Sequence, residues 1–180
     1  MRLLVVSDTH GDSANLISLL RVIGSSVDGL IHLGDGSGDI DTAARYGSPM
    51  PTAWCVRGNI DSDWSVPPSR RIQAGSQTIL AAHGQLHLGD SWQPFVSAAK
   101  KQGAQAFFFG HTHVPFLKWM DGVLLLNPGS LSRPRGIWGP SFAVVETPAT
   151  EGSRFRVRLY ELTGSSSRPR FVVIHPEALS

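Results

Sequence analysis

The chain has 180 residues, of which 41% are hydrophobic and 17% charged, and its formal net charge is +2 at pH 7. This composition predicts one globular domain over residues 1–180, and so small a net charge gives no support for stable nucleic-acid binding. The single cysteine, Cys55, excludes an intrachain disulfide. No apolar run approaches the ~20 residues of a membrane span and no secretory signal precedes Asp8, so we expect a cytoplasmic protein that makes no membrane contact.

The first third of the chain alternates short apolar runs with a helical spacing of apolar residues. In chain order the predicted elements are a strand at Leu3–Ser7, a helix at Leu16–Ile23, a strand at Asp28–Leu33, a helix at Asp39–Tyr46 and a strand at Ala53–Arg57. Asp12 or Ser13 is the expected N-cap of the first helix, and Gly24 ends it. A β-α-β-α-β order of this kind predicts parallel strands joined by right-handed crossovers.

The rest of the chain is richer in strands than in helices. The predicted elements are a hairpin of Arg70–Ala74 and Gln77–Ala82, a helix at Ser91–Gln102, a strand at Ala106–Gly110, a hairpin of Phe116–Met120 and Val123–Leu126, and strands at Ser141–Glu146, Arg154–Leu162 and Phe171–Ile174. Gly164–Pro169 is predicted to be a loose loop. About ten strands with three main helices favour two packed sheets with the helices outside, an α/β architecture.

Polar residues that can bind metal ions follow five of the predicted strands. They are Asp8 and His10, Asp35, Asn59, His83, and His111 with His113. Each has an ordinary alternative explanation: Asp35 could cap a helix, Asn59 could serve a turn, and His83 could be a core histidine. Their joint order is the signal, because a rigid sheet can converge its strand ends on one spot. Such a mixed oxygen and nitrogen donor set is typical of divalent metals.

The motifs Asp8-x-His10, Gly34-Asp35, Gly58-Asn59, His83 and Gly110-His111-x-His113 resemble those of the calcineurin-like metallophosphoesterase superfamily. The short chain, Asn127-Pro128-Gly129-Ser130 and Pro134-Arg135 are similar to its small bacterial and archaeal phosphodiesterase branch. That branch also contains the eukaryotic retromer scaffold subunit. The resemblance runs from Met1 to about Leu162 and implies a four-layer α/β/β/α sandwich of two mixed β-sheets flanked by helices.

Residue by residue, the resemblance implies a site for two divalent metal ions. One ion would be held by Asp8, His10, Asp35 and His113, and the other by Asp35, Asn59, His83 and His111, so that Asp35 bridges them. The implied activity is hydrolysis of a small phosphate ester, with a diester favoured over a monoester, by a metal-bridging hydroxide. Manganese is the expected metal, and Fe, Zn, Ni, Co or Mg are alternatives. Asn59 would orient the phosphate, and Arg135 could contact it.

Two departures from the family pattern concern the proton of the leaving group. Many relatives carry a His after the Asn of the third motif, where this chain has Ile60, although the small phosphodiesterase branch also lacks it. His87, two residues beyond His83-Gly84-Gln85, could replace that donor or lie on the surface.

Two other functions remain open on the sequence. The first is a metal-binding protein-interaction scaffold of the same fold with little or no turnover. The second, a zinc peptidase or amidohydrolase, would need a glutamate near the ligands, whereas Glu146, Glu151, Glu161 and Glu177 all follow the last ligand motif. The chain could also form a homo-oligomer.

Overall fold

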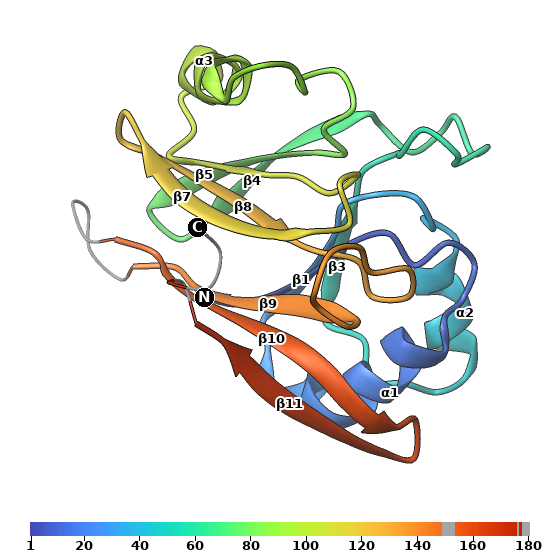
Figure 1. Cartoon of the computed structure of the whole chain (residues 1–180). Coiled ribbons are helices and arrows are strands. Elements are labelled where there is room, and N and C mark those ends of the chain that lie inside the picture. The colour runs from blue at the N-terminus through green and yellow to red at the C-terminus, as the bar shows by residue number, and fades with distance from the viewer. Residues whose placement is uncertain (149–153, 176, 178–180) are drawn as a thin grey trace.

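Two β-sheets packed face to face form the centre of the molecule (Figure 1). The computed structural model describes residues 1–148, 154–175 and 177; Glu151 lies outside them. The first sheet has six strands in the order β11-β10-β9-β1-β2-β3. Their bounds are β1 Arg2–Val6, β2 Gly29–His32, β3 Thr52–Cys55, β9 Ser141–Glu146, β10 Arg156–Ser165 and β11 Arg168–Ile174. β1, β2 and β3 pair in parallel, as the β-α-β-α-β pattern predicts, and β9 joins β1 antiparallel.

The second sheet has five strands in the order β4-β5-β6-β8-β7. The strands are β4 Ser69–Ala74, β5 Gln77–Ala82, β6 Ala106–Phe108, β7 Pro115–Met120 and β8 Val123–Pro128. β4 with β5 and β7 with β8 are the two predicted hairpins. The central pairs β5–β6 and β6–β8 are parallel, so both sheets are mixed.

Helices cover the outer face of each sheet. They are α1 Ala14–Ile23, the short 3₁₀ helix η1 Gly24–Ser26, α2 Asp39–Arg45 and α3 Gln93–Lys101. Leu16, Leu19 and Leu20 of α1 pack on the outer face of the first sheet, and Phe95, Val96 and Ala99 of α3 pack on the second. A third apolar cluster fills the space between the sheets. The predicted four-layer sandwich is confirmed, and Figure 1 shows its layers.

The prediction of a loose loop at Gly164–Pro169 is wrong. β10 continues to Ser165 and β11 starts at Arg168, so Gly164 pairs with Pro169 and the connection is a tight hairpin turn. Gly164 has φ +83°, and the turn needs that left-handed conformation, which glycine adopts readily. The serine and proline content suggested a loop, but the pairing of two long strands overrides it. No helix in the described ranges has the length and apolar character to cross a membrane.

Candidate metal centre

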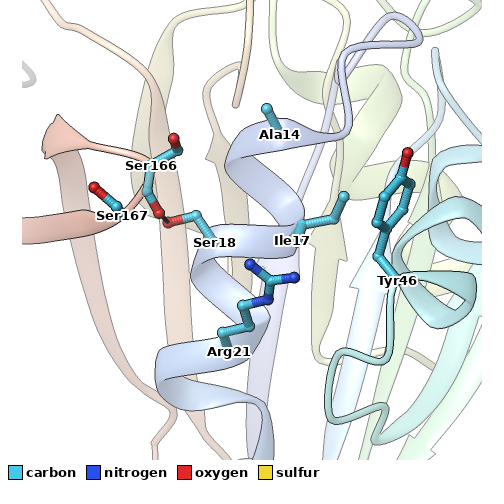
Figure 2. Close-up of a pocket in the computed structure, with 7 residues that line it drawn as sticks. All are labelled: Ala14, Ile17, Ser18, Arg21, Tyr46, Ser166 and Ser167. Atoms are coloured by element: carbon cyan, nitrogen blue, oxygen red, sulfur yellow. Dashed lines mark hydrogen bonds between the residues drawn. The ribbon is translucent and has the colours of Figure 1, made fainter.

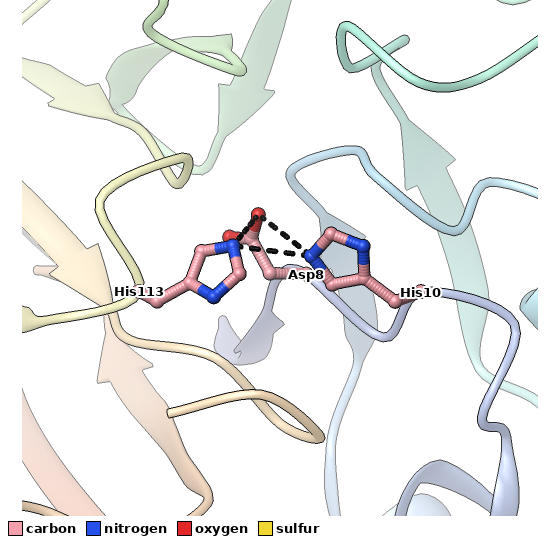
Figure 3. Close-up of side chains that lie close together, drawn as sticks. All are labelled: Asp8, His10 and His113. Carbon is pink, nitrogen blue, oxygen red and sulfur yellow. Dashed lines mark hydrogen bonds and ion pairs between the residues drawn. The ribbon is translucent and has the colours of Figure 1, made fainter. Parts of the chain in front are cut away.

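The ends of β1 and the segment after β6 bring together a first group of candidate ligands. Asp8, His10 and His113 each offer a ligand atom, and these atoms lie within 4.8 Å of one another. His113 Nε2 is 3.2 Å from Asp8 Oδ1 and 3.1 Å from His10 Nε2. Figure 3 shows the three side chains pointing toward one another. We call these three residues the first ligand group.

A second group lies at the ends of β2, β5 and β6. Asp35, His83 and His111 also offer atoms within 4.8 Å of one another. His83 Nε2 is 3.4 Å from Asp35 Oδ2 and 3.2 Å from His111 Nδ1. The exposed Asn59, after β3, places its Oδ1 3.1 Å from His83 Nε2. We call Asp35, His83, His111 and Asn59 the second ligand group.

The two ligand groups adjoin each other. Asp8 Oδ1 of the first group is 3.9 Å from His83 Nε2 of the second. The other oxygen of the same carboxylate, Oδ2, accepts a hydrogen bond from the backbone N–H of His111 at 3.0 Å. The structure therefore brings all seven sequence-predicted ligand residues to one place.

The donor atoms fit divalent cations. His113 Nδ1 donates to the carbonyl of Arg133 and His83 Nδ1 to that of Leu33 at 2.7 Å, which leaves the Nε2 lone pair of each neutral ring directed into the site. Asp8 is fully buried, and its Oδ1 has no hydrogen-bond partner although three imidazole nitrogens lie within 4 Å. A cation among these lone pairs would satisfy groups that are costly to bury unpaired.

The backbone carrying the ligands is held in an uncommon conformation. Asp8, His10, Asp35, His111 and His113 all have φ between +53° and +66°, the left-handed region that non-glycine residues rarely adopt. Glycines make room beside them: a Cβ on Gly58 would lie 2.1 Å from Asp35 Oδ1, and one on Gly110 2.7 Å from Asp8 Oδ2. Strained backbone of this kind concentrates at functional sites.

Histidine–carboxylate pairs dominate the electrostatics. Burial alone would raise the pKa of Asp35, but the hydrogen bond and charge of His83 outweigh it and hold this pKa at about 2. Burial lowers the pKa of His83, and the Asp35 and Asp8 carboxylates reverse the shift so that it ends raised. The contact with Asp8 raises the pKa of His113, while burial lowers those of His10 and His111. The site thus stabilises positive charge at its centre.

Asp61 organises the second ligand group, a role that the sequence analysis did not assign. Its two carboxylate oxygens accept four backbone N–H groups at 2.8–3.0 Å, those of Asp35, Gly36, Ser37 and Gly58. The carboxylate thus holds the turn after β2 against the turn after β3. The sequence shows only that an acidic residue lies two positions after Asn59. It does not indicate this role, because three of the four N–H donors lie more than 20 positions before Asp61.

Arg135 and His87 lie in different surroundings. Arg135 is exposed, its backbone N–H donates to the carbonyl of His113 at 3.1 Å, and its charge opposes protonation of that imidazole. The ring of His87 instead packs against Phe107 and Phe95, with centroids 5.0 and 5.4 Å away, in the cluster that α3 covers. The structure places Arg135 beside the ligands and His87 in that separate cluster.

Two hollows in the surface have different relations to the ligands. One of about 320 Å³ is lined by His10 of the first ligand group, by the turns after β1 and β2, and by Ile60–Asp63. The other, of about 340 Å³, lies between α1, Tyr46 and the β10–β11 turn; its charged lining residue is Arg21 (Figure 2). The first hollow therefore borders the first ligand group, and the second does not border either group.

Comparison with known proteins agrees with this architecture. The family described as the calcineurin-like phosphoesterase superfamily domain matches residues 1–150. A probable metallophosphoesterase of Bacillus subtilis, YsnB, is 31% identical over 166 residues, covering 92% of this chain and 94% of the relative. The phosphodiesterase YfcE of Escherichia coli is 26% identical over 157 residues, covering 76% and 82%.

Solved structures share the fold. A predicted phosphoesterase from Streptococcus pneumoniae superposes with a TM-score of 0.74 at 27% identity, covering 96% of this chain and 97% of that one. Vps29 of Chaetomium thermophilum has a TM-score of 0.76 at 20% identity over 97% and 94%, a likeness of fold alone. With its fold, its two ligand groups and the family match over 150 residues, this chain belongs to the calcineurin-like phosphoesterase superfamily.

Proposed function

We propose that this chain is a phosphodiesterase that acts with two divalent metal ions, manganese first among them. The observation that carries the proposal is the adjacency of the two ligand groups, which are 3.9 Å apart between Asp8 Oδ1 and His83 Nε2. Two divalent cations held there would neutralise phosphate oxygens and lower the pKa of a water so that it can attack phosphorus near neutral pH. Asp35 is the proposed shared ligand.

The chain's own residues would position the ester. The Asn59 amide lies beside His83, so its NH₂ can donate to a phosphate oxygen while Oδ1 faces the ligands. The exposed guanidinium of Arg135 would contact another phosphate oxygen. The alcohol of the ester would occupy the hollow that His10 shares with Ile60.

Charge favours a diester over a monoester. A phosphate monoester carries close to two negative charges at pH 7, since its second pKa is about 6, whereas a diester carries one. The guanidinium groups whose charge reaches the ligand histidines, Arg133 and Arg135, are both exposed to solvent. Solvent screens the charge of these two cations, so they neutralise the single charge of a diester more completely than the double charge of a monoester.

The test is hydrolysis of bis(p-nitrophenyl) phosphate by purified protein with Mn²⁺. We expect turnover that a chelator removes, and a loss of at least about 100-fold for Asp35→Ala. Asp41→Ala, at an exposed carboxylate of α2, is the matched control and should keep full activity. Equal activity of the Asp35→Ala and parent proteins would falsify the proposal.

A second candidate function is a metal-binding interaction scaffold. Trp64, Leu86 and Ile137 are 79%, 82% and 85% exposed, and they lie in loops that follow β3, β5 and β8, the edge that also carries the ligands. Exposed apolar side chains gathered on loops are typical of contact surfaces. Protein that binds Mn²⁺ tightly but cleaves neither aryl nor nucleotide diesters would favour this function.

A further inference from the structure

Three buried polar side chains outside both ligand groups form a hydrogen-bond chain. His32 ends β2, Thr9 lies in the turn after β1, and Asp39 starts α2. Their exposed fractions are 0%, 0% and 5%. His32 Nε2 is 3.0 Å from Thr9 Oγ1, which is 2.5 Å from Asp39 Oδ2. The metal chemistry proposed above does not use any of the three.

The direction of the hydrogen bonds in this chain follows from its ends. The backbone N–H of Gly34 donates to His32 Nδ1 at 3.2 Å, so Nδ1 is an acceptor and the ring proton is on Nε2. Nε2–H then donates to Thr9 Oγ1, and the Thr9 hydroxyl donates to Asp39. Asp39 Oδ2 also accepts the N–H of Gly11 at 3.0 Å. Each donor therefore has an acceptor, and the Gly36 carbonyl, 3.4 Å from Thr9 Oγ1, is a second and more distant acceptor for the Thr9 hydroxyl.

The chain fixes the two turns that carry the first and second aspartate ligands. Thr9 is the residue between Asp8 and His10, and Gly34 precedes Asp35. The turns are also joined by their backbones, because Asp8 N–H donates to Gly34 O at 3.0 Å and His10 N–H donates to Asp35 O at 2.8 Å. These three ligands have left-handed φ values, which the turns must hold against their intrinsic preference.

Close packing leaves this arrangement little freedom. A Cβ on Gly36, in the second of the turns, would lie 2.0 Å from Thr9 Oγ1 and 2.7 Å from Asp39 Oδ2. The turn after β2 therefore packs directly against the hydrogen-bonded Thr9 and Asp39 side chains. A shift of the Thr9 side chain would move Asp8, His10 and Asp35 together.

We propose that the His32–Thr9–Asp39 chain is a positioning device that sets the distance between the first and second ligand groups, and so the affinity of the site for a pair of divalent ions. The inference rests on the metal centre of the proposed function. It assigns the three residues no contact with substrate. Partners that orient metal ligands from outside typically change metal affinity 10–100-fold when removed.

The test removes the central hydroxyl and measures Mn²⁺ binding by calorimetric titration of metal-free protein. Thr9→Val keeps the shape of the side chain and deletes both hydrogen bonds, and it should raise the dissociation constant of at least one Mn²⁺ 10–100-fold. Thr9→Ser keeps the hydroxyl and should remain within about 3-fold of the parent protein. The absorption spectrum of Co²⁺-loaded protein should shift in Thr9→Val and not in Thr9→Ser.

A control separates positioning from simple stability. Thr78 of β5 is also buried, at 5% exposure, and its hydroxyl donates to Gln73 Oε1 at 3.1 Å in the other sheet. Thr78→Val should lower the melting temperature as Thr9→Val does, yet keep the parent Mn²⁺ affinity and Co²⁺ spectrum. If Thr9→Val does not fold, the Mn²⁺ affinities of His32→Gln and His32→Leu test the proposal instead. Only the Gln side chain can still donate a hydrogen bond to Thr9, so the His32→Gln protein should bind Mn²⁺ more tightly than the His32→Leu protein.

Each outcome supports or overturns the proposal. The proposal is overturned if Thr9→Val binds Mn²⁺ as the parent protein does, or if Thr9→Ser or Thr78→Val loses as much Mn²⁺ affinity as Thr9→Val. It is also overturned if His32→Gln and His32→Leu bind Mn²⁺ equally well. Because metal affinity and the Co²⁺ spectrum need no turnover, a parent protein that binds Mn²⁺ but hydrolyses nothing contradicts only the proposed function. A parent protein that binds no divalent ion overturns both.

Discussion

The two ligand groups are built from similar residues but differ in how the protein satisfies them. In the second group, Asp35 Oδ1 accepts the Ile60 N–H at 3.1 Å, and His83 contacts Asp35, Asn59 and the Leu33 carbonyl. In the first group, Asp8 Oδ1 and His10 Nδ1 are buried without a hydrogen-bond partner.

The difference indicates unequal dependence on metal. A buried carboxylate oxygen among imidazole nitrogens is costly unless something positive lies beside it. Each group can form a histidine–carboxylate ion pair in metal-free protein, because Asp35 raises the pKa of His83 and Asp8 raises the pKa of His113. The first group also buries His10 Nδ1 without a hydrogen-bond partner, so it gains more from a bound cation than the second.

The largest expected effect comes from exchanging each aspartate for asparagine. Asp8→Asn and Asp35→Asn should each lower Mn²⁺-dependent activity at least about 100-fold. Their effects on the melting temperature of metal-free protein should differ in size. Asp8→Asn should melt above Asp35→Asn, because it removes a fully buried charge and its NH₂ can donate to His113 Nε2. Asp35→Asn should melt lower, because it loses the pair with His83.

Differential scanning calorimetry after chelation, followed by addition of Mn²⁺, measures both melting temperatures. The Mn²⁺-induced rise in melting temperature should shrink in both variants. A metal-free Asp8→Asn protein that melts well below Asp35→Asn would reverse the comparison between the ligand groups.

The second expected effect is on the turn that carries the second ligand group. Asp61→Ala leaves four backbone N–H groups without their charged acceptor, and hydrogen bonds to a charged group contribute about 1.5–3 kcal/mol each when partly buried. We expect a lower melting temperature and a 10–100-fold loss of activity. Asp41→Ala is the control, because Asp41 is an exposed carboxylate of α2 that does not line the hollow beside His10. Equal effects of the two substitutions would contradict this role of Asp61.

The pH dependence of metal-free protein sharpens the comparison further. The pKa of Asp35 is about 2 in the folded chain against 3.8 ordinarily, so its ionised form stabilises the fold at pH values above about 4. That contribution should be lost as the pH falls from about 4 to about 2. Urea unfolding across this range should show the loss in the parent protein and a weaker one in Asp35→Asn. Parallel pH profiles would argue against the His83–Asp35 ion pair.

The smallest expected effect is at Arg135. Its side chain is exposed, so the proposed contact with phosphate would be screened by solvent. Arg135→Gln should raise KM for an aryl phosphodiester about 3–10-fold with little change in kcat. Arg158→Gln, on the exposed surface of β10, should change neither. A drop in kcat without a change in KM would place Arg135 in the reacting step rather than in binding.

Local patterns were enough to predict most of the fold. Apolar runs ended by polar or glycine residues marked the strands within a few residues, and apolar spacing marked α1 and α3. The β10–β11 turn was predicted wrongly, because its serine and proline residues favour a loop and only pairing of the two strands makes it a tight hairpin. The serine N-cap of α1 is in place, but its side chain makes no capping hydrogen bond.

The sequence by itself determined which residues are available as ligands, because each stands at the end of its own strand, where side-chain type and strand boundary are both local properties. Only the tertiary structure decided how these residues sort into two adjoining groups. It also decided that His87 packs under α3, and that Asp61 and His32 hold the ligand turns by hydrogen bonds to distant residues. The physical reason is that hydrogen bonds and close packing join residues 20 to more than 100 positions apart, and no local pattern specifies those distances.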